Sequence, residues 1–355
     1  MSAPEPVPAC MPQPVEDAPC AVCGTAGSDR VCSARELRAQ YRYLMQFHQR
    51  RLIPEGDGGV AQSALTDRVE FTQNYATDIV SCAACGLIYR NPRPSPEAIA
   101  RTYTKDKYGR EHLTAAFDAQ LGLARVKAKS LARWLPETGE VHIVEVGSFV
   151  GGFLVAGQER GWNMFGVDPG HEVVAFCRER GLRVHRGALA DAPLKPQSVD
   201  GIAIWNTFDQ LPDPHPTLKA AQRVLHPGGL LALRVPNGAC FQRAEAAMRR
   251  LPRPLRRWLR TAMAWNNLLA FPYLQGYSLP TLDRLLARYQ MQRISAYPDT
   301  LVQLADAQTK AWAALEERLV KTFCRVAWLV ERRRKPNSMT AAPWLDAYYR
   351  YNPHH

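Results

Sequence analysis

Short apolar runs alternate with helix-like segments through the middle of the chain. The runs have the length of buried strands and lie at 142–146, 164–167, 183–185, 201–205 and 230–235. Between them, apolar residues recur every three or four positions, which predicts helices at 151–160, 171–180 and 216–225. Strands that alternate with helices in this way are typical of βαβ units and a parallel sheet.

The pattern differs on both sides of this region. After Asn237 the alternation stops, and it resumes with a predicted helix at 279–288 and a strand at 293–297. Upstream, helices are predicted at 34–52, 96–108 and 112–135, and a strand at 78–80. Near the end, 311–330 is either one helix or a helix followed by an edge strand at 323–330.

These shifts predict four parts. Residues 1–19 carry six prolines and few large apolar groups, which predicts a disordered tail. Residues 20–95 form a small cysteine-rich module, and residues 96–300 form the α/β domain, with an inserted basic lid at 240–277. Residues 301–355 are expected to be a helical, basic extension.

Composition excludes several classes of protein. With 46% hydrophobic and 22% charged residues, the chain is not collagen-like, coiled-coil or wholly disordered. The sequence contains neither a secretory h-region nor an apolar run long enough to span a membrane. We therefore expect a reducing, cytoplasmic location, where cysteines serve as thiols or metal ligands.

The positive charge is concentrated in the last third of the chain. The net charge is +12, and residues 241–355 alone hold 19 Lys and Arg against 8 Asp and Glu. Such a region favours an anionic partner, which charge alone does not identify as a small molecule, a membrane surface or nucleic acid.

A glycine-rich turn follows the first strand and runs from Gly147 to Gly152. In dinucleotide folds a second glycine follows two residues after the first, but Phe149 stands there and disfavours NAD and FAD. A ligand bound through adenosine and an amino-acid moiety tolerates that bulk, and Glu145 could hold its amine. S-adenosylmethionine fits this description.

Asp168 ends the second strand, 21 residues after Gly147. A carboxylate at this position accepts hydrogen bonds from ribose hydroxyls in related folds. The alternative is that Asp168 caps the helix near His171, and that Glu145 is an ordinary charge at a strand end.

These residues resemble a known family. The segments 145–151, 166–169 and 225–229, followed by Pro236-Asn237, are similar to motifs of class I, Rossmann-like, S-adenosylmethionine-dependent methyltransferases, over roughly 142–297. The resemblance implies a doubly wound, mostly parallel, seven-stranded-type sheet and a small-molecule acceptor such as a saccharide or secondary metabolite. It implies a cofactor site formed by Glu145, Gly147, Ser148, Gly151 and Asp168.

The loop after the fourth strand departs from the family. Gln210 stands where the family commonly has a histidine, and an amide is no general base near neutral pH. Asp209 is the candidate catalytic base or orienting group, and the alternative is a solvent-facing loop carboxylate.

Two cysteine pairs, each followed by glycine, predict a zinc-ribbon-like module. The four candidate ligands of a structural Zn²⁺ are Cys20, Cys23, Cys82 and Cys85. The upstream run 82–94 is similar to a bacterial methyltransferase subgroup with such a knuckle. Because 58 residues separate the pairs, the helix at 34–52 must be an insertion, and Cys32 could substitute for one ligand. The alternative is four free thiols.

Basic and aromatic residues alternate through 249–269. This pattern favours an amphipathic helix that lies on an anionic membrane or closes over an anionic substrate. The alternative is a lid or dimer-contact helix whose basic face is solvated.

The leading hypothesis is methyl transfer from S-adenosylmethionine to a small-molecule acceptor, which could be anionic. A second hypothesis is RNA or DNA methylation, which the lack of an Asn-Pro-Pro-Tyr type of sequence in the 205–214 loop disfavours. A third is a cofactor-binding protein without catalysis, suggested by Gln210.

Overall fold

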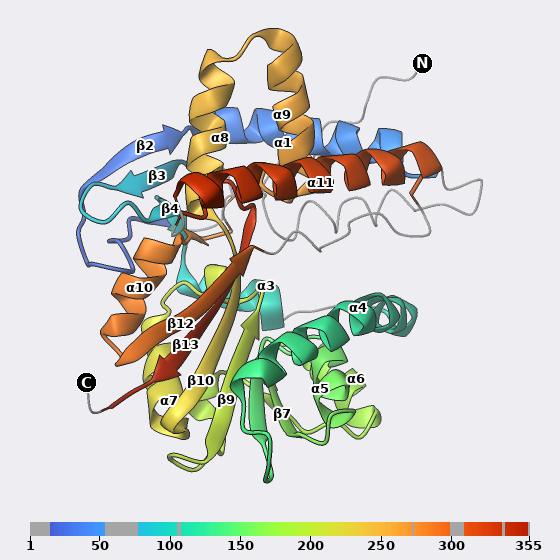
Figure 1. The fold of residues 1–355 in the computed structure, drawn as a ribbon, viewed down its shortest axis with the longest axis vertical. Coiled ribbons are helices and arrows are strands. Elements are labelled where there is room, and N and C mark those ends of the chain that lie inside the picture. The colour runs from blue at the N-terminus through green and yellow to red at the C-terminus, as the bar shows by residue number, and fades with distance from the viewer. Residues whose placement is uncertain are drawn as a thin grey trace.

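The computed structural model describes residues 15–53, 77–104, 108–271, 273–298, 309–335 and 338–353 (Figure 1). Its centre is a seven-stranded sheet in the order β12-β13-β10-β9-β6-β7-β8. The strands are β6 (His142–Val146), β7 (Asn163–Asp168), β8 (Val184–Arg186), β9 (Val199–Trp205), β10 (Leu225–Pro236), β12 (Met291–Pro298) and β13 (Trp344–Tyr351). β8, β7, β6, β9 and β10 pair in parallel, and β13 is antiparallel to both of its neighbours. The predicted doubly wound, mostly parallel fold is confirmed.

Helices cover both faces of the main sheet because successive strand residues point to opposite sides. In β6, Ile143 packs with residues of α4 (Arg110–Leu131), α5 (Gly152–Gln158) and α6 (His171–Glu179). Its neighbour Val144 packs with residues of α7 (His215–Val224) and α10 (Leu279–Ala287) on the other face. The short elements of this part are α3 (Pro96–Thr104), η2 (Ala132–Trp134), η3 (Leu189–Asp191) and η4 (Phe208–Gln210).

A small sheet lies beside the main one, in the order β11-β4-β3-β2. Its strands are β2 (Ser28–Cys32), β3 (Ile79–Cys82), β4 (Ile88–Arg90) and β11 (Gln275–Gly276), and a separate pair joins β1 (Val15–Glu16) to β5 (Arg93–Pro94). Cys20, Cys82 and Leu87 belong to the same apolar cluster as Val144 of the main sheet. The cysteine-rich module therefore shares a core with the α/β domain.

Four helices form a further layer beside the small sheet and above the main sheet in the view of Figure 1. They are α1 (Ala34–Arg51), α8 (Gly238–Arg250), α9 (Arg253–Trp265) and α11 (Ala311–Arg334). Phe47 of α1 meets Trp265 of α9 with ring centroids 5.0 Å apart, and Arg51 pairs with Glu316 of α11 at 2.7 Å. One apolar cluster unites all four helices.

This layer differs from the lid expected at 240–277. α9 packs on α1, α8 and α11, and Gln275 and Gly276 form a strand of the small sheet. The segment buries its apolar side on helices far from it in sequence, so it is part of a helical layer.

The C-terminal extension differs from its prediction in one respect. α11 is a continuous helix over Ala311–Arg334, so residues 323–330 are helical and form no edge strand. Residues 344–351, which we expected to belong to a helical extension, form β13 and insert between β10 and β12. The α/β domain is therefore completed by the end of the chain.

Most of the predicted disordered tail, residues 1–14, lies outside the described residues. Its last part is ordered, because β1 pairs with β5 and the Ala18 N–H donates to Asn91 Oδ1 at 2.9 Å. No helix in the described ranges is long and apolar enough to cross a membrane.

Candidate functional site

The turn between β6 and α5 is shaped by glycines in the left-handed region. Gly147 and Gly151 have φ values of 76° and 78°, which residues with a Cβ rarely adopt. A Cβ on Gly147 would lie 2.1 Å from Thr207 Oγ1, after the end of β9. The turn is thus held tightly against the β9 loop, and a larger residue at Gly147 would force the two apart.

Glu145 is buried beneath this turn, with 5% of its surface exposed. Its Oε2 has no hydrogen-bond partner among the described residues. Burial, and secondarily the charge of Asp168, raises the pKa of Glu145 well above its usual range. A buried carboxyl with an unsatisfied oxygen is suited to a ligand that brings a cation or a hydrogen-bond donor.

Asp168, at the end of β7, is bonded to the turn itself. Its Oδ2 accepts from the Phe149 N–H at 2.8 Å and its Oδ1 from the Gly170 N–H at 2.9 Å. Gly170 is the N-cap residue of α6, and because Asp168 accepts from its N–H, Asp168 also contributes to the start of that helix. Each carboxylate oxygen has a second lone pair, so Asp168 can also accept from a bound ligand.

The structure brings the predicted cofactor residues together at the carboxyl ends of β6 and β7. Ser148 is 3% exposed, and its Oγ has no partner in the described part of the chain. Phe149 adopts φ 43° and lies edge-on to Tyr108, with centroids 5.7 Å apart. The set consists of two carboxyls and a hydroxyl, and it contains no cation for a pyrophosphate.

Asp209 lies in η4, which follows β9. It is 1% exposed, so the solvent-facing alternative is wrong, and neither carboxylate oxygen has a partner among the described residues. Burial raises the pKa of Asp209 to about 7, although the nearby positive charge of Arg234 acts in the opposite direction. Its neighbour Gln210 accepts from Tyr103 Oη at 2.7 Å and donates to Asn206 O at 2.5 Å, which fixes the loop.

A group of buried charges that sequence reasoning missed lies beside this loop. Lys127 of α4 pairs with Asp346 of β13 at 2.5 Å, and Arg234 of β10 lies 3.9 Å from the same carboxylate. Arg234 also donates to Asn206, next to Thr207. Lys127 lies on the apolar face of its helix and Arg234 inside an apolar strand, which are signals that could have identified both.

The four predicted metal ligands form one cluster. The sulfur atoms of Cys20, Cys23, Cys82 and Cys85 all lie within 4.8 Å of one another. The Cys20–Cys85 and Cys23–Cys82 distances are both 3.5 Å, close to the roughly 3.8 Å between sulfurs around a tetrahedral zinc. In each cysteine pair a glycine with φ near 77° donates its N–H to the backbone carbonyl of the first cysteine. These bonds are Gly24 to Cys20, at 2.8 Å, and Gly86 to Cys82, at 2.9 Å. Cys32 is not a member of the cluster.

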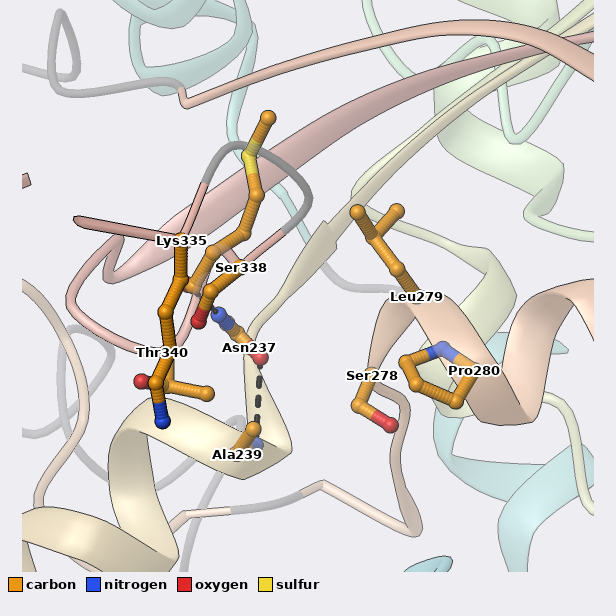
Figure 2. A pocket seen from close by; sticks show the side chains of 9 residues that line it. Asn237, Ala239, Ser278, Leu279, Pro280, Lys335, Ser338 and Thr340 are labelled. Atoms are coloured by element: carbon orange, nitrogen blue, oxygen red, sulfur yellow. Dashed lines mark hydrogen bonds between the residues drawn. The ribbon is translucent and has the colours of Figure 1, made fainter. Parts of the chain in front are cut away.

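A cavity of about 470 Å³ lies between the start of α8 and the start of α10 (Figure 2). Asn237, at the end of β10, lines it, together with Ser278. It contains none of the predicted cofactor residues, so it is separate from the Gly147 turn. The cavity is lined by Asn237, Ala239, Ser278, Leu279, Pro280, Lys335, Ser338, Met339 and Thr340.

Comparison with solved structures gives matches of low identity. One is a chain of the complex between the Haloferax volcanii Trm112 methyltransferase activator and a methyltransferase, at 18% identity, covering 67% of this chain and 97% of that one, with a TM-score of 0.44. Another is geranyl diphosphate C-methyltransferase from Streptomyces coelicolor A3(2), at 16% identity, covering 64% and 75%, with a TM-score of 0.40. A third is an S-adenosylmethionine-dependent methyltransferase from Mesorhizobium loti, at 17% identity, covering 62% and 96%, with a TM-score of 0.41.

The sequence comparisons are more specific. No curated protein matches the chain. Residues 144–233, from β6 through β10, match the model of the methyltransferase domain family. This range holds the glycine turn, Asp168 and the β9 loop. The chain therefore contains a class I, S-adenosylmethionine-dependent methyltransferase domain and carries a four-cysteine cluster N-terminal to it.

Proposed function

We propose that this methyltransferase acts on a small polar acceptor and binds S-adenosylmethionine at Glu145, Gly147, Ser148, Gly151 and Asp168. The observation that carries the proposal is the pair of buried, unsatisfied oxygens, Glu145 Oε2 and Ser148 Oγ, at the turn to which the Asp168 carboxylate is bonded. Buried polar atoms are usually hydrogen-bonded, so the orphaned oxygens are best explained as ligand contacts.

Each residue has a physical role in this proposal. S-adenosylmethionine supplies, when bound, a methyl group on a positively charged sulfur. Glu145 binds the amine, because an ammonium ion stabilises the ionised carboxylate that burial disfavours. Asp168 accepts from the ribose hydroxyls while the Phe149 N–H fixes its orientation. Gly147 and Gly151 give the turn the backbone shape that it needs.

The acceptor is expected to lie between the turn and the buried charges of the β9 loop. Thr207 touches Gly147, and its neighbour Asn206 accepts from Arg234, so the two groups are contiguous. Lys127, Arg234, Asp346 and Asp209 are each no more than 7% exposed. Such an enclosed polar site suits a small molecule better than a nucleic-acid strand.

Asp209 is the proposed catalytic base. It takes the role of the family's histidine, at whose position this chain has Gln210. Its pKa of about 7 places it near the value at which a carboxylate both accepts and holds a proton at physiological pH. In this role Asp209 takes the proton that the acceptor's nucleophilic atom loses.

We propose that the cysteine cluster holds one structural zinc ion. The four sulfurs provide a closed set of ligands, which is typical of structural sites and leaves no position for substrate. The cysteine-rich module shares its core with the α/β domain. The metal would therefore also stabilise the segment that follows β11, where Tyr277 lies near Asp209.

A thermal-shift titration tests the cofactor. S-adenosylmethionine and its demethylated product should each raise the melting temperature, whereas NAD should not. A shift with NAD alone, or with none of the three, would overturn the cofactor assignment.

The acceptor class is tested with methyl-labelled S-adenosylmethionine. The protein is incubated separately with a desalted pool of anionic metabolites and with mixed RNA and DNA. Label transferred to the metabolite pool and not to nucleic acid is the expected result. Transfer to nucleic acid alone would contradict the small-molecule assignment and leave the cofactor assignment intact.

A further inference from the structure

Exposed apolar side chains gather on one helix. Seven of the large apolar residues that are at least 36% exposed lie on α11, and two more lie on α9. On α11 they recur every three or four positions and so form one stripe along the helix. The stripe consists of Trp312, Leu315, Leu319, Phe323, Val326 and Val330.

The exposed part of α9 continues this stripe. Trp258 meets Phe323 edge-on with ring centroids 4.4 Å apart, although both are about half exposed. Trp258 ends an exposed segment, 252–258, near the tip of the α8–α9 hairpin, which projects from the top of the molecule in Figure 1. The apolar surface therefore spans two helices.

The charges around the stripe are positive. Arg318, Arg325 and Arg332 are exposed and repeat every seven residues beside it, and Arg253, Arg256 and Arg257 are exposed on α9. The acidic residues of α11 are all engaged with the protein: Glu316 with Arg51, Glu317 with Lys321 and Glu331 with Arg243. α9 contains no acidic residue.

Much of the net positive charge of the chain lies in this layer of four helices. α1, α8, α9 and α11 together hold 18 Lys and Arg against 5 Asp and Glu. A surface that combines an exposed apolar stripe with neighbouring exposed arginines complements the acyl boundary and headgroups of an anionic bilayer.

We propose that the outer face of α9 and α11 is a docking surface for an anionic membrane, on which the protein lies peripherally. A second copy of the chain fits this surface less well than a membrane does. A symmetric contact along α11 would bring Arg318, Arg325 and Arg332 of both copies close together, where they would repel one another. Nucleic acid fits less well, because phosphates gain nothing from a stripe of leucine, phenylalanine and tryptophan. This inference does not depend on the identity of the methyl acceptor.

Sedimentation with vesicles tests the proposal on the full chain. Wild type should sediment with vesicles of phosphatidylcholine and phosphatidylglycerol and remain in the supernatant with phosphatidylcholine alone. Replacing Arg253, Arg256 and Arg257 by Gln should lower the partition coefficient on the order of 100-fold at low salt. The matched control changes three exposed cations of the α/β domain to Gln: Lys129, Arg133 and Lys195. It should leave the partition coefficient within about twofold of the wild-type value.

The apolar stripe needs its own variant. Leu315→Ser with Leu319→Ser, at positions 58% and 64% exposed, should reduce partitioning on the order of tenfold or more without unfolding the protein. Val126→Ser, at a 47% exposed position on α4, is the control. The proposal would be overturned if wild type sedimented with neither kind of vesicle. It would also be overturned if wild type were a dimer that the double variant converts to a monomer. Sedimentation that depends on the arginines but not on the leucines would overturn it as well.

Discussion

Asp168 accepts a hydrogen bond from the backbone N–H of Phe149, 2.8 Å away, and so joins the end of β7 to the turn that follows β6. Phe149 has φ 43°, a conformation that costs free energy in a residue with a side chain. The carboxylate thus stabilises the turn in addition to its proposed contact with the cofactor.

Replacing Asp168 by Ala should weaken S-adenosylmethionine binding by about 1.5 to 3 kcal/mol, the range for losing hydrogen bonds to a charged group. Asp168→Asn should be affected less, because one amide oxygen can still accept. Isothermal titration calorimetry measures both, with Asp29→Ala, at an exposed position of the small sheet, as the control. Equal affinities for wild type and Asp168→Ala would place the adenosine elsewhere.

The affinity for S-adenosylmethionine should depend on pH through Glu145. Burial, and then Asp168, raises the pKa of Glu145 in the free protein, and a bound ammonium ion lowers it again. Binding then releases a proton, so affinity rises with pH up to the pKa of the free protein. Glu145→Gln should bind more weakly and lose this dependence. Calorimetry in buffers of different ionisation enthalpy detects the proton, and a wild type that releases none would contradict the role of Glu145.

The central βαβ region was predictable because each of its strands is a short apolar run bounded by turn residues. β6 spans the predicted 142–146, and β7 spans 163–168 against a predicted 164–167. The turn and both carboxyls were predictable for the same reason, since strand ends fix where side chains meet. What the sequence pattern does not contain is the pairing of distant segments.

Three examples show this limit. β13 carries Asp346, Arg350 and four aromatic residues, so its composition does not predict a buried strand. The strand is buried only because it pairs with β10 and β12. The α8–α9 hairpin has the pattern of any amphipathic pair of helices, and the surface that it covers is supplied by α1 and α11. The buried Lys127–Asp346 pair joins residues more than 200 positions apart, which local patterns cannot reveal.

The purified protein should contain close to one zinc ion per chain. Cys82→Ser should lower both the metal content and the melting temperature, because metal binding contributes to folding free energy in such modules. Cys32→Ser removes a buried thiol outside the cluster and is the matched control for metal content. Elemental analysis by mass spectrometry measures the ratio. Protein prepared without chelators that holds no metal would leave the four cysteines as free thiols.

Asp209 should give the protein a stability that falls as pH rises. Its folded-state pKa is about 7, whereas an unfolded aspartate has a pKa of about 3.9, so folding favours the protonated form. This contribution to the free energy of unfolding is complete below pH 4 and is lost between about pH 4 and 7. Asp209→Asn cannot ionise, so its melting temperature relative to wild type should rise across that window. Asp213→Asn, an exposed carboxyl in the same loop, should not change the profile.

The same variant tests catalysis. If Asp209 accepts the proton, turnover of S-adenosylmethionine in an acceptor-containing fraction should rise to a plateau above about pH 7. Asp209→Asn should reduce the rate by roughly 100-fold or more and make the remaining rate independent of pH in this range. A residue that only positions the loop would lower the rate and keep the pH profile of the wild type. That outcome would remove Asp209 as the base while leaving its effect on stability unchanged, because burial alone causes the latter.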